Sequence, residues 1–432
     1  MNTSSKPIIG IIGLGYVGLP LAAVAAEAGF DVLGFDVNPK VCDGINAGIS
    51  HIKDIPTLRL QPLVERGMIR ASTNFDALKD CGLVSICVPT PLNKIKDPDL
   101  SYVVSATEAI AARLQKGQIV ILESTTYPGT TRDLMLPLLE KSGLTVGEEF
   151  YLCFSPERVD PGNEKWTTKN TPKVLGGITE ACLQEGLAVY EQIFDRMVPV
   201  QNTEAAELVK VYENTFRMIN IALANELSMV CDRLGISVWE VIEAAATKPF
   251  GFMKFTPGPG LGGHCIPLDP HYLSWKMRNL SFKTRMIEVA SEINGEMPEY
   301  TVNKVAMALN EQGKSLKGSK ILLLGIAYKK DIDDLRESPA LDIVRILQQR
   351  GATVMYHDPY CPVIADDGHT NIPLLPMYHS ELGDELLQSA DALVVVTDHS
   401  QLNYHDLAAK AKVWVDMRGT LFQPNHGRAT TS

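Results

Sequence analysis

The feature that most constrains the fold is a glycine-rich turn set between an apolar strand pattern and an alanine-rich helical pattern. The strand pattern covers residues 7–12, the helical pattern covers 19–28, and between them the chain reads Gly13-Leu14-Gly15-Tyr16-Val17-Gly18. A second strand pattern over 31–35 ends at Asp36. This order is typical of the first βαβ unit of a dinucleotide-binding fold, whereas the glycines alone would be a weak signal.

The glycines and the aspartate each predict a contact, and we assign the whole six-residue turn to cofactor binding. Gly13 permits the tight turn, Gly15 lets the main chain approach a pyrophosphate, and Gly18 lets the helix pack on the strand. The carboxylate of Asp36 would hold ribose hydroxyls and repel a 2′-phosphate, so we expect NAD rather than NADP. The alternative is a plain βαβ turn with a surface aspartate.

Three further strand patterns end in small or polar residues. Those over 83–88 and 119–122 run into Pro89-Thr90-Pro91 and Ser124-Thr125-Thr126, and one over 150–154 runs toward Glu157-Arg158. Because ligands of open parallel sheets lie beyond the carboxyl ends of the strands, we expect the first two segments to line the nicotinamide half of the site. Glu157 and Arg158 would lie at the same rim, and a solvated charge pair on a loop is an equal alternative.

A long helical pattern runs from residue 203 to about 234. Lys210 and Asn214 stand four apart in it and therefore share one face. A lysine at such a place can donate hydrogen bonds to an oxygen that becomes negative during a reaction. The alternative is an ordinary solvated face of the helix.

A single cysteine follows a loop that is crowded with glycine. Residues 258–263 contain four glycines, Cys265 follows, and Asp269-Pro270 resembles the N-cap and first-turn proline of a helix. A thiol just before a helix N-terminus is favoured as the thiolate. We therefore interpret Cys265 as a nucleophile and the glycines as room for a bulky ligand. The alternative is a small apolar residue in the core.

The alternation of strands and helices begins again after a polar stretch over 310–319. The first strand of this later part, 320–324, lacks the glycine triplet, but a cationic set follows it, made up of Lys329, Lys330, Arg336 and, after the final strand, Arg418. These side chains would meet the phosphates of a nucleotide-linked substrate or lie on the surface as ordinary charges. The fold class we predict is α/β, with two Rossmann-like doubly wound domains joined by a central long-helix region. The domain boundaries we expect are 1–202, 203–314 and 315–432.

Composition excludes several classes of partner. The net charge of −11 argues against nucleic acid, and no apolar run is long enough to span a membrane. The eight cysteines show no spacing that is typical of a metal site, so we expect reduced thiols, a cytoplasmic protein and no structural metal.

Six motifs in this order resemble the UDP-glucose/GDP-mannose dehydrogenase family over essentially the whole chain. They are the glycine turn, Ser124-Thr125, Ser155-Pro156-Glu157, the helical segment 207–217, Gly262-Gly263-His264-Cys265, and Lys329 with Asp333-Asp334 and Arg336. The resemblance implies an NAD-dependent, four-electron oxidation of a nucleotide sugar at C6 to a carboxylate. It also implies a thiohemiacetal and then a thioester on Cys265.

The resemblance assigns roles to the candidate residues. It implies that Lys210 or Asp269 takes a proton in the first oxidation, that Lys210 and Asn214 stabilise an oxyanion, that Glu157 and Asp269 assist thioester hydrolysis, and that Thr125 positions water or cofactor. The substrate would be held by Glu157, Lys210, Asn214, Lys254, Phe255, Gly258, Gly260, Lys329 and Arg418, with Arg158 at the same rim. Arg336 would approach NAD.

One departure from the family pattern bears on the substrate. Members that act on UDP-glucose typically carry Ser and Lys where this chain has His264 and Leu268. The loop resembles the branch that oxidises UDP-N-acetylhexosamines, above all the UDP-N-acetylglucosamine 6-dehydrogenases of bacterial surface-polysaccharide (lipopolysaccharide O-antigen) synthesis. UDP-N-acetylgalactosamine, UDP-N-acetylmannosamine and UDP-glucose are alternatives.

The rival activity is that of a two-electron hydroxyacid dehydrogenase, which also carries a Lys and an Asn four apart on a long helix. It would leave Cys265 and the second α/β part without a use. We expect the protein to form a homodimer or a higher homo-oligomer through its apolar helical region.

Overall fold

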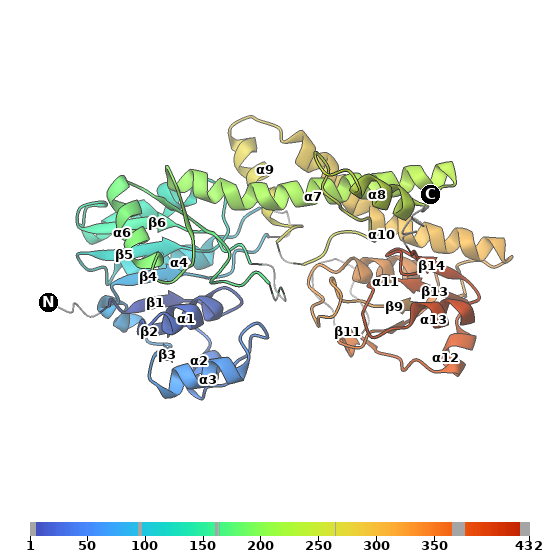
Figure 1. Ribbon diagram of the computed structural model, residues 1–432, viewed down its shortest axis with the longest axis horizontal. Coiled ribbons are helices and arrows are strands. Elements are labelled where there is room, and N and C mark those ends of the chain that lie inside the picture. Colours follow the sequence, from blue (N-terminus) through green and yellow to red (C-terminus); the bar gives the residue numbers. More distant parts are fainter. Residues whose placement is uncertain are drawn as a thin grey trace, which may run out of the picture. The chain divides into compact units, whose positions relative to one another are not determined.

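The computed structural model describes residues 6–93, 97–159, 163, 165–263, 265–364 and 376–423. The chain divides into two compact units, Met1–Glu213 with His271–Phe282, and Asn214–Pro270 with Lys283–Ser432. Each unit is built on its own sheet, mostly parallel in the first unit and wholly parallel in the second, and the predicted α/β class with two Rossmann-like domains and a long central helix is confirmed (Figure 1). The three domain boundaries expected from the sequence stay predictions.

The first unit contains an eight-stranded sheet in the order β3-β2-β1-β4-β5-β6-β7-β8. All neighbouring strands pair in parallel except β6 and β7, which are antiparallel. The strands are β1 Ile9–Ile12, β2 Val32–Phe35, β3 Ile69–Ser72, β4 Leu83–Ile86, β5 Gln118–Leu122, β6 Phe150–Phe154, β7 Lys173–Gly177 and β8 Met197–Val200. The helices between them are α1 Gly18–Glu27, α2 Pro39–Asn46, α3 Thr57–Glu65, α4 Ser101–Ala111, α5 Leu136–Leu139 and α6 Glu180–Tyr190.

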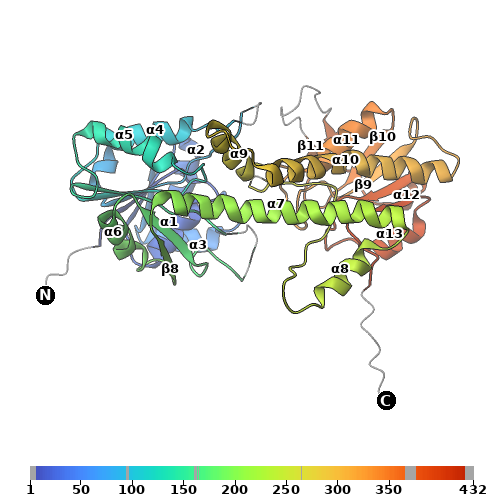
Figure 2. The ribbon, with the colours of Figure 1, turned by 90° about the horizontal axis from the view of Figure 1, so that it is seen from above.

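Helices cover both faces of this sheet. Ile9 and Ile11 point into a core shared with α1 and α6, whereas Ile12 points into a core shared with α4 and α5. Figure 2 shows α4 and α5 on one side of the sheet and α1 and α6 on the other. A strand buried on both faces must be apolar at successive positions, which explains the continuous apolar runs in the sequence.

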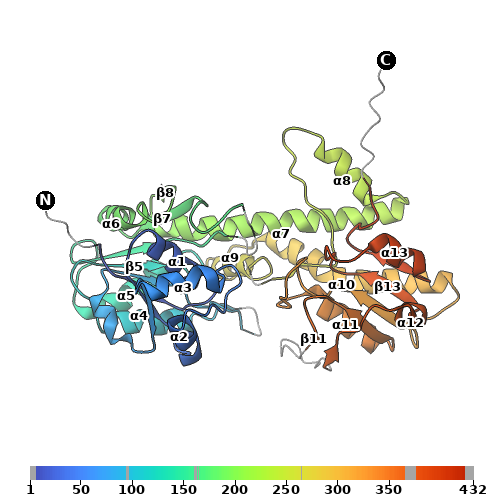
Figure 3. The same ribbon diagram turned by 60° about the horizontal axis from the view of Figure 1, so that its bottom comes forward.

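The middle of the chain is helical. α7 spans Thr203–Leu234, the bounds that periodicity predicts, and α8 spans Val238–Ala246. Figure 3 shows α8 and the loop after it projecting from α7. α9 spans Asp269–Asn279, so Asp269 is the first residue of the helix and the expectation that it is the N-cap is wrong. α10, Arg285–Glu311, was not predicted and contains Pro298.

The second unit contains a four-stranded parallel sheet in the order β10-β9-β13-β14. The strands are β9 Lys320–Leu324, β10 Thr353–His357, β13 Ala392–Val395 and β14 Trp414–Asp416, and a small hairpin joins β11 Val363–Ile364 to β12 Met377–Tyr378. α10 and α11 (Pro339–Gln349) pack on one face, and α12 (Asp384–Ser389) and α13 (Tyr404–Lys410) on the other. Among the described residues, no helix has the length and apolarity to cross a bilayer.

The first βαβ turns of the two units share a backbone pattern but use their aspartates differently. Gly13 and Gly325 both have positive φ and donate to the carbonyl that ends the neighbouring strand. Asp36, which follows β2, is partly exposed and accepts the N–H of Leu14 at 3.0 Å. Its counterpart Asp358, which follows β10, is buried, so a ribose cannot reach its carboxylate.

Five donors saturate the Asp358 carboxylate. Oδ2 accepts the N–H groups of Ile326 (2.7 Å) and Ala327 (3.1 Å) and pairs with Nε2 of His399 (2.9 Å). Oδ1 accepts the N–H groups of Tyr360 (2.8 Å) and Cys361 (3.0 Å). Burial raises the pKa of this carboxyl, but its hydrogen bonds from His399 and the backbone outweigh that effect and lower the pKa to about 2. The aspartate therefore holds a turn and is not free to bind a sugar.

Candidate active site

The glycine turn of the first unit has the geometry that a dinucleotide requires. A Cβ at Gly13 would lie 2.7 Å from the carbonyl oxygen of Cys87, and one at Gly18 would lie 1.8 Å from that of Gly13. These two glycines are therefore required by the fold itself. Nothing lies within 4 Å of a Cβ built at Gly15, so the main chain there faces open space at the start of α1. Open N–H groups at a helix N-terminus suit a pyrophosphate.

The strand ends beside this turn are fixed by hydrogen bonds. Ser124 Oγ donates to the carbonyl oxygens of Ile86 (3.3 Å) and Val88 (2.7 Å), which ties the end of β5 to that of β4. The hydroxyl of Tyr272, on α9, donates to the carbonyl of Thr90. Thr90 and Ser124 are buried, whereas Pro91 and Thr125 are partly exposed and Pro89 is exposed. The open edge here is the place where we expected the nicotinamide half.

Lys210 lies on α7 and is only 8% exposed. Within the described part of the chain its ammonium group has no hydrogen bond or ion pair, which is unusual for a buried charge. Its charge is felt by Glu157, where burial raises the carboxyl pKa but Lys173, two backbone N–H groups and Lys210 together lower it. Glu157 is thus held as a carboxylate, and the Nζ atom of Lys210 has hydrogen-bonding capacity to spare.

Arg158 does not pair with its neighbour Glu157. Its guanidinium forms an ion pair with Glu213 of α7 and donates to the carbonyl of Pro172 at 2.8 Å. Both alternatives drawn from the sequence, a rim group for ligand and a solvated charge pair with Glu157, missed this link to α7.

A buried glutamate on α7, which belongs to a family motif but received no role from the sequence, holds the loop that follows Thr125. Glu207 accepts the N–H groups of Gly129 (2.5 Å) and Thr131 (2.8 Å) and the hydroxyl of Thr131 (2.7 Å). Burial raises the pKa of Glu207 to about 7, against the lowering effect of these hydrogen bonds. Because Glu207 stands one turn before Lys210, it couples that loop to the part of α7 that carries the lysine.

In the second unit, Cys265 is exposed, whereas the other seven cysteines are buried. Its carbonyl oxygen accepts the N–H groups of Leu268 (3.2 Å) and Asp269 (2.8 Å), so the turn leads directly into α9. The Asp269 carboxylate accepts the amide of Asn214 at 2.5 Å. Two of the predicted catalytic residues are thereby brought together, and His264 lies outside the described residues.

The glycines before Cys265 pack against the chain itself. A Cβ at Gly262 or Gly263 would lie 2.5 Å or 2.7 Å from the side chain of Tyr328, and Gly263 N–H donates to the carbonyl of Arg336 at 3.0 Å. The expected bulky neighbour is therefore, at these two positions, a tyrosine of the same unit. Gly258 is different, because a Cβ there would lie 2.9 Å from the guanidinium of Arg418.

The remaining candidate residues already have protein partners. Lys254 forms an ion pair with Glu243, Arg336 with Asp334, and Arg418 with Asp398. The Phe255 ring contacts that of Phe216 edge-on at 5.9 Å, Lys329 is partly exposed, and Gly260 has a φ of 139°. An anionic ligand would have to compete with, or replace, these carboxylates.

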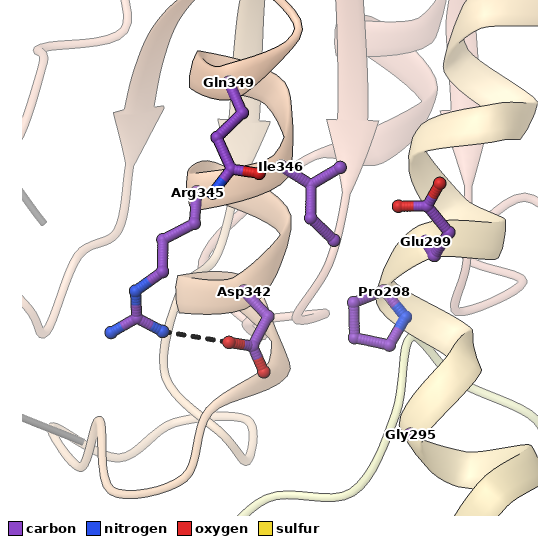
Figure 4. Close-up of a pocket in the computed structure, with 7 residues that line it drawn as sticks. All are labelled: Gly295, Pro298, Glu299, Asp342, Arg345, Ile346 and Gln349. Atoms are coloured by element: carbon purple, nitrogen blue, oxygen red, sulfur yellow. Dashed lines mark hydrogen bonds and ion pairs between the residues drawn. The ribbon is translucent and has the colours of Figure 1, made fainter. Parts of the chain in front are cut away.

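The second unit also has a hollow of about 230 Å³ between α10 and α11 (Figure 4). Gly295, which has no side chain, and Pro298 line it from α10. Asp342 and Arg345 pair with each other at 2.9 Å, and Glu299 pairs with Arg350. Because these charges are already compensated and none of the candidate residues lines the hollow, we do not assign it to the active site.

Comparison with known proteins adds three family matches that cover most of the chain. Residues 8–194 match the NAD binding domain of the UDP-glucose/GDP-mannose dehydrogenase family, residues 204–296 its central domain, and residues 322–423 its UDP binding domain. The match of the first region agrees with the glycine turn and Asp36, and the expectation of NAD is confirmed.

Several curated relatives match nearly the whole chain. A UDP-N-acetyl-D-mannosamine dehydrogenase of Pyrococcus horikoshii is 34% identical, covering 97% of both chains. A UDP-N-acetyl-D-glucosamine 6-dehydrogenase of Salmonella typhi is 35% identical, covering 91% of this chain and 90% of its own. An NDP-N-acetyl-D-galactosaminuronic acid dehydrogenase of Ralstonia solanacearum is 36% identical, covering 95% of both. The solved structure of the Pyrococcus horikoshii UDP-D-ManNAc dehydrogenase superposes with a TM-score of 0.87, at 34% identity and 97% coverage of both chains.

Proposed function

The chain belongs to the UDP-glucose/GDP-mannose dehydrogenase family, and from that premise we propose that it oxidises the C6 hydroxymethyl group of a UDP-N-acetylhexosamine to a carboxylate, using two NAD in succession. The observation that carries the proposal is the exposure of Cys265 at the entrance to α9, in a chain whose other cysteines are all buried. A two-electron dehydrogenase has no use for such a thiol.

The preferred substrate we propose is UDP-N-acetylglucosamine. The loop from Gly258 to Pro270 supports this choice by its resemblance to that branch of the family. The names of the relatives support an N-acetylated hexosamine more broadly, because they include mannosamine, glucosamine and galactosamine derivatives. The alternatives are UDP-N-acetylmannosamine, UDP-N-acetylgalactosamine and UDP-glucose, and the test below compares them directly.

NAD fits the first unit because the open space at Gly15 and the partly exposed carboxylate of Asp36 suit its pyrophosphate and ribose. When bound, it supplies the acceptor for a hydride in each of the two oxidations. In the first, the C6 hydroxyl must also lose a proton, and either Asp269, directly or through water, or the neutral amine form of Lys210 accepts it. Pro89, Thr90, Pro91 and Ser124 would line the nicotinamide side, and Arg336 would approach the cofactor.

In the second oxidation the thiolate of Cys265 adds to the aldehyde carbon and forms a C–S bond. The aldehyde oxygen becomes negative, and Lys210 and Asn214 stabilise it with hydrogen bonds, a type of contact typically worth about 3 to 4 kcal/mol. Removal of the second hydride leaves a thioester. Water then adds to the thioester carbon and gives its proton to Glu157 or Asp269, and the C–S bond breaks with its electron pair returning to sulfur. Thr125 would position this water or the cofactor.

The UDP-sugar would be held mainly by groups of the second unit. Arg418 beside Gly258 and the partly exposed Lys329 are the cations that we propose for the phosphates. Lys254, Phe255 and the main chain at Gly260 would contact the rest of the ligand, and Arg158 would contribute through its fixed position near Glu157.

We also propose a homodimer that forms through α7. A stripe of apolar side chains runs along this helix, and each of its members is between 41% and 66% exposed: Leu208, Tyr212, Phe216, Leu223, Val230 and Leu234. Their spacings of four and seven residues keep them on one face. An exposed apolar stripe of this length is typical of a protein interface.

A cytoplasmic location and a role in surface-polysaccharide synthesis complete the proposal. All eight cysteines are free, which suits a reducing compartment.

The test is the number of NADH formed per sugar, followed by absorbance with UDP-N-acetylglucosamine, UDP-N-acetylgalactosamine, UDP-N-acetylmannosamine, UDP-glucose and GDP-mannose. We expect two NADH per sugar and a clear preference among the first three. One NADH with a stable keto product would indicate the two-electron alternative. Cys265→Ser should block acid formation and leave NAD binding intact.

A further inference from the structure

A chain of five side chains runs beneath the carboxyl edge of the first sheet and ends at Glu157. Ser85 on β4 hydrogen-bonds Tyr190 of α6 at 2.9 Å, and Tyr190 donates to Glu123 at 2.6 Å. Lys173, the first residue of β7, then pairs with Glu123 at 2.5 Å and with Glu157 at 3.3 Å. The first four of these side chains are almost completely buried, with Lys173 only 3% exposed.

The position of Lys173 follows from the one antiparallel pairing in the sheet. Phe154 of β6 stands opposite Gly176 of β7. Continuing that register by three residues sets Glu157 against Lys173. The lysine therefore enters the sheet from the side where strands β1 to β6 end, the edge that is followed by Thr125 and Glu157.

The charges along this chain alternate in sign. Glu123 and Lys173 form a pair without net charge. A buried ammonium group without a carboxylate would lower the free energy of unfolding by several kcal/mol, which is on the order of the whole margin of stability. Glu157 adds a second carboxylate on the other side of the ammonium, and the charge of Lys210 acts on Glu157 in turn. Two further kinds of group act on Glu157. One is the thiol of Cys87, which stays neutral because burial raises its pKa, and the other is a pair of backbone N–H groups of the loop that contains Glu157, at 2.7 and 2.9 Å.

We propose that Lys173 is a positioning residue for acid formation. Its ammonium holds Oε2 of Glu157 while the backbone N–H groups of Arg158 and Val159 hold Oε1, so the carboxylate has one orientation and stays ionised. An ionised, oriented carboxylate is what the last step needs, since water that adds to the thioester must lose its proton to that oxygen. The inference rests on the role proposed above for Glu157 and adds the group that maintains it.

The variants that test this separate charge from packing. Lys173→Arg keeps the cation. The double change Glu123→Gln with Lys173→Met removes both members of the buried pair, so that no carboxylate of that pair is left without its partner and folding is preserved. Adding Glu157→Gln to the double variant gives a reference that lacks only the carboxyl of interest.

Two measurements are then made. The first follows the infrared carbonyl band of protonated carboxyl groups as the pH is changed. Subtracting the spectrum of the triple variant from that of the double variant isolates Glu157 in the double variant, and subtracting Glu157→Gln from the native protein isolates it in the native background. The second is the pH dependence of the second NADH phase, with the UDP-N-acetylhexosamine that the native enzyme oxidises.

We expect Glu157 to take up its proton at a higher pH in the double variant than in the native protein. The acidic limb of acid formation should move in the same direction, and acid formation at neutral pH should fall roughly tenfold or more, part of the 10²–10⁴ that a positioned base contributes. The first hydride transfer should be unchanged, and Lys173→Arg should keep both the titration of Glu157 and the rate of acid formation close to those of the native protein.

A folded double variant in which Glu157 titrates as before, with an unchanged pH profile, would overturn the proposal and leave Lys173 as a structural ion pair. The two proposals fail in different ways. If the native enzyme gives one NADH per sugar, the four-electron function is wrong, and the infrared titration alone decides whether Lys173 sets the charge of Glu157.

Discussion

Replacing Asp358 by Asn should destabilise the second unit severely. Both oxygens of the carboxylate accept hydrogen bonds, three at Oδ2 and two at Oδ1. An amide group turns one of the two acceptors into a donor that faces other donors, so at least two hydrogen bonds are lost whichever way the amide is oriented. Hydrogen bonds to charged groups contribute about 1.5–3 kcal/mol each, which gives a loss of roughly 3–6 kcal/mol.

The matched control is Asp36→Asn, at the corresponding place in the first unit. Among the residues that the structure describes, Asp36 accepts two backbone N–H groups, from Leu14 and Asn38, and it is partly exposed. We expect a loss of only about 1 kcal/mol there, because water replaces what the side chain gives up.

Urea denaturation of both variants at pH 7, followed by fluorescence and by proteolysis of each unit, measures the two losses. The acid dependence gives a second reading. The pKa of Asp358 in the folded protein is lowered to about 2, so its stabilisation is complete above the unfolded value near 3.8 and is lost as the pH falls from there through 2. Two outcomes would contradict the role given to this carboxylate: a loss in Asp358→Asn no larger than that in Asp36→Asn, or a native unit with no added acid sensitivity relative to the variant.

Two further predictions follow from α7. Burial raises the pKa of Glu207 to about 7, so the folded state binds this proton more tightly than the unfolded state, and stability should fall as the pH rises from about 4.5 to 7 and then level off. Glu207→Gln should remove that slope in thermal melts between pH 4.5 and 8. A slope that persists in the variant would assign it to another group. Leu223→Glu, in the middle of the exposed stripe, should lower the mass measured by sedimentation to that of a monomer, whereas Glu226→Gln on the same helix should leave the mass unchanged. A native protein that is itself monomeric would contradict the proposed interface.

The sequence predicted the parts of the fold that depend on local pattern. The glycine turn, the strands on either side of it and the bounds of α7 follow from the order of apolar and small residues, because period and turn chemistry are written within a few neighbouring positions. α10 escaped prediction because Gly295 and Pro298 interrupt its pattern, and packing against α11 maintains the helix in spite of them.

The site was harder to read, since its contacts join residues far apart in the chain. The exposed Cys265 and the pair Asn214–Asp269 involve residues that motifs pick out. The partners of Lys173 depend on strand order and register, and those of Glu207 and Arg158 depend on contacts between α7 and loops of the first unit. A lysine at the start of the apolar run Lys173-Val174-Leu175 was the available signal, because a charge in a buried strand must have a partner. The sequence could not say that the partners are Glu123 and Glu157.

The central claim is that the sugar becomes an acid while attached to Cys265. Its most direct test is mass spectrometry of the enzyme quenched during turnover, with hydrolysis slowed by Glu157→Gln and with Cys265→Ala as the control. We predict that the peptide containing Cys265 gains the mass of the oxidised nucleotide sugar as an acyl group. Acid formation that continues in Cys265→Ala, with no adduct on any peptide of the quenched enzyme, would contradict the account.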